Sequence, residues 1–335
     1  MRRDLMNGPR RVADAVTHLL EHERFDLVWV NLLSAHQAGH NFWELEPLSD
    51  GGSPAVQREL ERTLEDVYGA SDAALGRILA TLPPDADVVV FSPLGMGANM
   101  SRSDLLPDML RAVLDGAPSA VSSEGVGKGN SLWRLRAALP AGWRAGLARR
   151  MPGVAVRELV RRLYLRNVDW SSTRAVALPG DHFGYLRLNL RGREREGIVD
   201  PADAEALMEE IATGLKSFTD PDGSPSVARV ERVAEAISGP HVDRLPDLVV
   251  RWSERPSKDV TFVSSERHGK VVRRGVGSGW TGNHVEGGWI VLPPAGGRVR
   301  ELGRPPQVVD IAATACALAG ADTSGLAGEP LLEAA

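Results

Sequence analysis

The chain has 335 residues, of which 43% are hydrophobic and 25% charged, which is typical of a globular protein with one large domain or two medium ones. Its formal net charge of -5 argues against a general nucleic-acid binder, because such proteins carry a basic stripe.

Three further features restrict the class of protein. No apolar run reaches the roughly 18 residues that a membrane span needs, so no membrane segment is expected. Cys316 is the single cysteine, which excludes an intrachain disulfide. Met1 to Asp4 is followed by no apolar signal core, so we expect a cytoplasmic protein.

The first part of the chain alternates helical and extended patterns. Residues 10–23 have apolar side chains at helical spacing, and the compact apolar run from Phe25 to Leu33 predicts a buried strand. Ser53 and Pro54 start a second predicted helix, which Pro83 and Pro84 end. A second buried strand is predicted over Asp87–Phe91.

This order of helix and strand, repeated twice, predicts an α/β fold with a mostly parallel sheet flanked by helices. Ligand sites in such sheets lie beyond the carboxyl ends of the strands. The segments after Val30 and after Phe91 are therefore the expected site loops.

The rest of the chain is expected to complete one domain, residues 1–335. Residues 117–168, rich in Gly, Ser, Arg and Trp, predict an inserted cap over the site loops. The expected strands beyond it are 174–178, 184–190, 227–233, 247–252 and 271–274, and the expected helices are 201–215 and 308–319.

Three histidines are the strongest candidates for a functional site. His36 and His40 follow the first predicted strand, and His284 comes just before another apolar run, Trp289–Leu292. Histidines beyond the ends of two strands can meet in space and hold a metal ion. Histidines can also persist as hydrogen-bonded core or loop residues, and this alternative stays open.

Several short motifs occur in a fixed order along nearly the whole chain. They lie in Asp26–Trp43, Tyr68–Leu79, Val88–Gly97, Asp169–Ala175, Tyr185–Val199, Asp247–Val250, Gly282–His284 and Asp310–Thr314. As a set they resemble the alkaline phosphatase superfamily, in its branch of predicted phosphohydrolases and phosphomutases related to the type I phosphodiesterase/nucleotide pyrophosphatases.

The resemblance implies an alkaline-phosphatase-like α/β fold and a two-metal site for phosphate or sulfate esters, but key positions differ. His36 stands where the family has an aspartate ligand, and Pro93 and Leu94 stand where it has its Asp-His pair. The N-terminal region that should carry the nucleophile is not recognisable. His40 and His284 match the family's ligand types.

The first hypothesis is therefore a divergent hydrolase or transferase that uses at most one metal ion. His36, His40 and His284 would hold a zinc ion, and Asp181 and His182 are the candidates for acid–base catalysis on a small phosphate or sulfate ester.

Two alternatives remain. The first is that the chain is a non-catalytic binding or scaffold protein, because fold does not imply function. The second is that a partner chain or a second copy completes the sheet. If the first strands of the predicted sheet are missing, its edge would be exposed and apolar.

Overall fold

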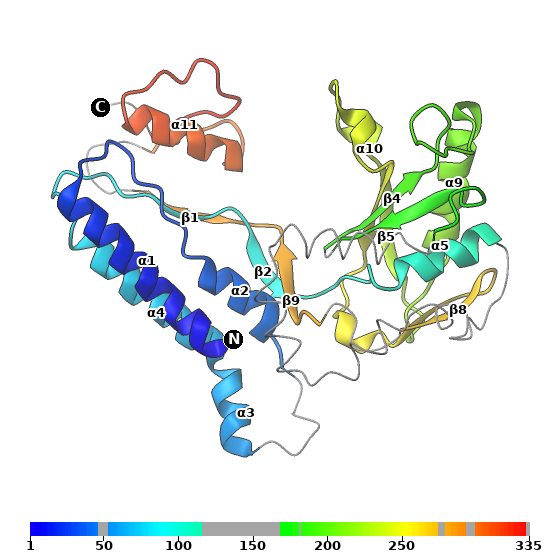
Figure 1. Cartoon of the computed structure of the whole chain (residues 1–335), viewed down its shortest axis with the longest axis horizontal. Helices are drawn as coiled ribbons and strands as arrows, with labels where there is room; N and C mark the ends of the chain where they lie inside the picture. The colour runs from blue at the N-terminus through cyan, green and yellow to red at the C-terminus, as the bar shows by residue number, and fades with distance from the viewer. Residues whose placement is uncertain (46–52, 116–167, 181, 274–278, 293–298, 333–335) are drawn as a thin grey trace. The chain divides into compact units, whose positions relative to one another are not determined.

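A computed structural model (Figure 1) describes residues 1–45, 53–115, 168–180, 182–273, 279–292 and 299–332. The chain divides into two compact units. Unit 1 contains Met1–Asn99 and Gly279–Ala335, and unit 2 contains Met100–Ser278.

Unit 1 is mainly helical, with short two-stranded ladders. Its helices are α1 (Arg2–His22), α2 (Leu33–Phe42), α3 (Pro54–Glu61), α4 (Thr63–Leu79) and α11 (Val308–Leu318). Its strands are β1 (Val90–Ser92), β2 (Gly95–Ala98), β9 (Gly282–Val285) and β10 (Trp289–Val291). β1 pairs with β10 and β2 pairs with β9, both antiparallel.

Apolar contacts hold α1, α2 and α4 together. Leu5 of α1, Ala38 of α2 and Val67 of α4 form one buried cluster. Ala13 and Ala74 belong to a second cluster further along α1 and α4. The small side chain of Ala38 lets α2 approach the helix pair closely, which fixes the position of the segment that carries His36 and His40.

Unit 2 contains a four-stranded antiparallel sheet in the order β3-β4-β6-β5. These strands are β3 (Ala175–Leu178), β4 (Gly184–Leu188), β6 (Leu248–Trp252) and β5 (Val227–Arg232), and a separate hairpin pairs β7 (Phe262–Ser265) with β8 (Gly269–Val272). In the part of unit 2 that the structure describes, the helices and short 3-10 turns are α5 (Leu106–Asp115), η1 (Pro201–Asp203), α9 (Ala204–Lys216), α10 (Val233–Ala236), η2 (Val242–Arg244) and η3 (Ser257–Asp259).

The core of unit 2 lies where α5 and α9 pack on this sheet (Figure 1). Met109 of α5, Ile211 of α9 and Leu186 of β4 are all fully buried there. β4 and β6 alternate buried and half-buried residues, so each strand turns one face to this core.

The prediction of a mostly parallel, alkaline-phosphatase-like α/β sheet is wrong for the described residues. Every ladder there is antiparallel, and the one parallel pairing is the single bridge between Leu190 and Val199. The alternation of β4 and β6 is the pattern of antiparallel strands with one covered face, whereas parallel strands are covered on both faces and read as continuous apolar runs.

The first predicted strand is also wrong. Residues 25–32 form no strand, and Phe25 and Trp29 are 50% and 60% exposed. The second is shorter than expected: β1 covers Val90–Ser92 and pairs with β10, a partner from the far end of the chain. An apolar run shows that a segment is suited to burial, but it does not choose the partner.

Other local predictions agree with the structure. Ser53 caps α3 by accepting a hydrogen bond from the Val56 N–H at 3.3 Å, although the single predicted helix is split at Arg62 into α3 and α4. The later strands and helices lie close to their predicted ranges. The predicted cap lies outside the described residues except for Val168. None of the described helices has the length and apolarity to cross a membrane.

Candidate metal centre

Helix α2 presents two imidazoles on one side. His36 and His40 are four residues apart, a spacing that places side chains on the same helical face. Their ring centroids are 4.8 Å apart and the rings are nearly perpendicular. The helix therefore brings two potential metal ligands to the same point.

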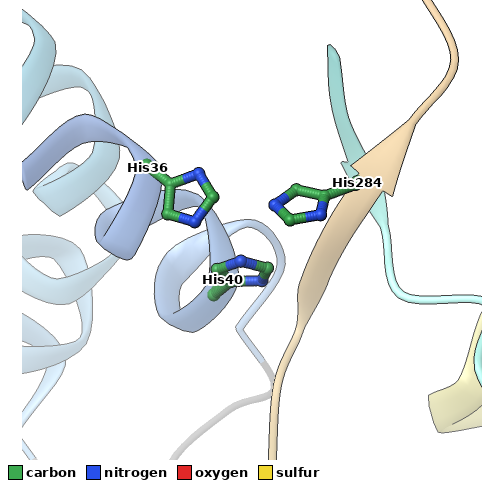
Figure 2. A group of neighbouring side chains, drawn as sticks. All are labelled: His36, His40 and His284. Carbon is green, nitrogen blue, oxygen red and sulfur yellow. The ribbon is translucent and has the colours of Figure 1, made fainter. Parts of the chain in front are cut away.

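The third imidazole comes from strand β9. His284 lies opposite Met96 of β2 in the antiparallel ladder. Its ring centroid is 4.9 Å from that of His36 and 4.9 Å from that of His40. Figure 2 shows the three rings turned toward one another from α2 and β9, and one ring nitrogen from each lies within 4.8 Å of the other two.

Backbone hydrogen bonds join α2 to the start of β9. The Thr281 N–H donates to the His40 carbonyl at 2.9 Å, and the Thr281 side-chain oxygen accepts from the Trp43 N–H at 3.1 Å. The Asn99 N–H donates to the Thr281 carbonyl at 3.0 Å. Thr281 thus connects the helix and both strands that surround the histidines.

His40 is the most constrained of the three histidines. It is 5% exposed, and its Nδ1 lies 3.0 Å from the Gly282 carbonyl. Because a carbonyl only accepts, Nδ1–H is the donor, which leaves Nε2 of the neutral ring as the lone-pair atom. Trp280 packs against the ring at a centroid distance of 4.1 Å. This is how metal-binding histidines are usually oriented by their neighbours.

Two glycines allow the close approach of helix and strand. A Cβ added to Gly282 would lie 2.2 Å from the Gly39 carbonyl oxygen, and one added to Gly39 would lie 2.8 Å from the Met96 side chain. Both distances are below ordinary van der Waals contact. At Gly282 the obstacle is backbone, so the absence of a side chain there is required for the histidine cluster, whereas the flexible Met96 side chain can shift to make room at Gly39.

The electrostatics of the cluster favour neutral rings. Desolvation by burial, and then the positive charge of a protonated His40, lower the pKa of His36 from its ordinary value of 6.5. The desolvation is partial, because His36 as a whole remains exposed. A neutral imidazole is the form that binds a metal ion.

The three side chains fit a zinc-like ion in type and number. Three neutral nitrogen ligands with one open position are a known zinc arrangement. Tetrahedral bonds of about 2.0 Å require ligand nitrogens about 3.3 Å apart, so the 4.8 Å cluster has to contract slightly. His36 is exposed and can rotate, whereas His40 is held on two sides.

The other sequence candidates are not among the described residues of unit 1. Asp181 lies outside the described residues, and His182 belongs to unit 2. Burial, and then the charge of Arg251, lower the pKa of His182, and its ring packs against Phe183 at 3.9 Å. Leu94, which the sequence resemblance aligns with a metal-ligand position, is 47% exposed.

Trp280 and Asn283 are neighbours of the site whose contacts the sequence did not indicate. Trp280 stacks on His40, and the Asn283 side chain accepts from the His284 N–H at 2.8 Å and donates to Asn99 at 3.3 Å. Asn283 lies within the Gly282–His284 motif, and the only sequence signal for Trp280 was its position four residues before His284.

No protein-family model matches this chain, and the searches of curated proteins and of solved structures also give no match. The resemblance to the alkaline phosphatase superfamily therefore stays a prediction from sequence motifs.

Proposed function

We propose that the chain is a metal-dependent hydrolase or transferase that holds one zinc-like ion on His36, His40 and His284 and acts on a phosphate or sulfate ester. The observation that supports this proposal best is the convergence of three imidazoles from α2 and β9 (Figure 2).

The charge of such a site favours an anionic substrate. Three neutral imidazoles leave the double positive charge of the ion uncompensated. When bound, the ion acts as a Lewis acid and stabilises negative charge on an ester oxygen. Phosphate and sulfate esters are the substrates that the sequence resemblance implies, and they carry the charge that this site would attract.

The residues of the chain have separate roles in this proposal. Gly282 and Trp280 orient His40, and Thr281 holds the end of α2 against β9. His36, the exposed ligand, faces the side from which a substrate can approach. The site thus has a rigid buried wall and an accessible side.

Elemental analysis of protein prepared without an affinity tag tests the proposal, together with turnover of a panel of phosphate monoesters, phosphodiesters and sulfate esters. We expect metal-dependent turnover that His284→Ala abolishes, with loss of one bound ion per chain. His241→Ala is the matched control, because His241 is exposed and lies in unit 2. Unchanged metal content in His284→Ala would refute the metal site.

A second candidate function, a non-catalytic binding protein, is favoured by an apolar surface in unit 1. Phe25, Leu27 and Trp29 are between 50% and 60% exposed, as are Trp289 and Val291 of β10. Trp29 contacts Phe91 of β1, and Phe25 and Leu27 belong to the same segment; these three exposed side chains, Phe25, Leu27 and Trp29, are called here the aromatic patch. Trp289 and Val291 lie on the other face of the ladder, because Phe91 pairs with Ile290 and side chains alternate along a strand. Contiguous exposed apolar surface usually marks an interaction site.

We propose a second copy of this chain as the partner, because dimers most often bury the same patch of both subunits. The half-exposed rings of Phe25 and Trp29 offer about 200 Å² of apolar surface, which is enough for the centre of an interface of about 800 Å² per subunit.

Light scattering over a range of concentrations tests this partner. We expect a dimer that Trp29→Glu converts to a monomer, and Tyr68→Glu is the control because Tyr68 is 54% exposed on α4. A wild-type chain that is monomeric at every concentration would exclude it.

A further inference from the structure

A second group of potential ligands lies at the end of α1. His18, Glu21 and His22 are all exposed, and one ligand atom from each lies within 4.8 Å of the other two. None of them belongs to the cluster of His36, His40 and His284. The group is therefore independent of the site described above.

The spacing of these residues follows from the helix. In His18-Leu19-Leu20-Glu21-His22 the ligand types stand at i, i+3 and i+4, so they occupy an arc of about 100° on one face. The two rings are close, with centroids 4.3 Å apart. A folded α1 thus presents two nitrogen ligands and one carboxylate to the same point in solvent.

A hydrogen bond of the helix orients the second ring. His22 Nδ1 lies 2.7 Å from the His18 carbonyl, which can only accept, so Nδ1–H is the donor. The neutral ring then has its lone pair on Nε2. A metal-binding histidine commonly donates its other ring nitrogen to a backbone carbonyl in this way.

The end of the helix also favours a cation. Helix α1 has 21 residues and ends at His22; the Glu23 N–H donates to the Leu19 carbonyl, and the carbonyls after Leu19 have no partners within the helix. The partial negative charge at a helix C-terminus stabilises a positive charge there. A metal ion held by His18 and His22 would lie beside this end of the helix.

We infer that the last turn of α1 is a second binding site for a divalent transition-metal ion of the zinc class, with His18 and His22 as nitrogen ligands and Glu21 as the oxygen ligand. The donor set of two imidazoles and one carboxylate suits zinc. Figure 1 shows α1 running from the region of α2 away to its C-terminal end, so the two groups of histidines lie at opposite ends of this helix.

Equilibrium dialysis against Zn²⁺ tests the inference on the full chain, prepared without a histidine tag. We expect two bound ions per wild-type chain, one in His22→Ala, one in His284→Ala and none in the double variant. His241→Ala should keep both ions. Circular dichroism checks that the variants keep their helices.

The two sites give distinguishable failures. The site on α1 would be overturned if His22→Ala still bound two ions. It would also be overturned if the wild-type chain bound one ion and His284→Ala bound none. Two ions bound by His284→Ala would overturn the three-histidine site instead. His18→Ala is a second test of α1 and should also lose one ion, whereas Glu21→Gln keeps both histidines and should bind the second ion more weakly.

Discussion

His36 shows how a single side chain adapts to the histidine cluster. It is the most exposed of the three histidines, yet burial of part of its ring and the charge of His40 both lower its pKa. A pKa below 6.5 keeps the ring neutral, and therefore ready to bind a metal ion, over a wider pH range.

The pH dependence of the metal-free protein follows from this shift. The unfolded chain binds more protons than the folded chain between pH 6.5 and the lower folded pKa of His36. The stability that neutral His36 contributes is thus complete above pH 6.5 and is lost as the pH falls through the folded pKa. NMR titration of the ring should give a midpoint below 6.5, and His40→Ala should move it upward. A midpoint at or above 6.5 in the wild type would contradict this.

Arg102 and Asp220 form a fully buried ion pair in unit 2. Both side chains are 0% exposed, and Ser226 donates a further hydrogen bond to Asp220 at 2.7 Å. Removing one partner of such a pair leaves the other charge buried without compensation.

We expect Asp220→Ala to lower the free energy of unfolding of unit 2 by about 3–5 kcal/mol, measured by urea denaturation. Asp222→Ala is the control, because Asp222 is 48% exposed and pairs with Arg255 at the surface. An exposed pair contributes little to stability, because water screens its charges. Equal effects of the two substitutions would show that burial of the pair is not what matters.

At the scale of elements, the candidate metal centre depends on how closely α2 approaches β9. Gly282 lies at the closest point, where an added Cβ would meet Gly39 and Trp43. The helix alone supplies two histidines at the correct spacing, but the third arrives only through this contact between segments about 240 residues apart.

Gly282→Ala should therefore separate α2 from β9 and lower the Zn²⁺ affinity of the three-histidine site, measured in a His22→Ala background by competition with a chelating dye. Gly76→Ala is the matched control, because a Cβ there meets nothing within 4 Å. Gly76 lies inside α4, where alanine should stabilise the helix by about 0.5–1 kcal/mol. An unchanged affinity in Gly282→Ala would mean that the close approach is not required.

At the scale of the whole molecule, the two units have cores of different size. Among the described residues, unit 2 has one continuous core built from α5, α9 and the sheet, whereas unit 1 has two small clusters between helices. Apolar burial is the main favourable term in folding, so unit 1 should be the less stable unit.

Calorimetry should then give two transitions, and Zn²⁺ should raise only the lower one in a His22→Ala background. An ion at 100 times its dissociation constant stabilises the folded state by about 2.7 kcal/mol. The additional substitution His284→Ala should remove the increase. A shift of the upper transition alone would contradict the assignment of the site to unit 1.

Short-range pattern was sufficient for much of the local structure. Several elements are close to their predicted positions: the cap at Ser53, the helices at 201–215 and 308–319, and the strands of unit 2. Their signals are residue spacing, capping residues and turn residues, which act within a few positions of the chain. The choice of His36, His40 and His284 also came from local signals.

Local patterns did not predict which distant segments pair. An apolar run does not specify its partner, which can lie far along the chain. The sequence therefore did not show that Phe25–Leu33 would form no strand, or that β1 would pair with β10. The grouping of His284 with the histidines of α2 likewise depends on the β2–β9 ladder, the Thr281 hydrogen bonds and Gly282. These contacts exist only in the folded chain, because they join segments that have no local reason to meet.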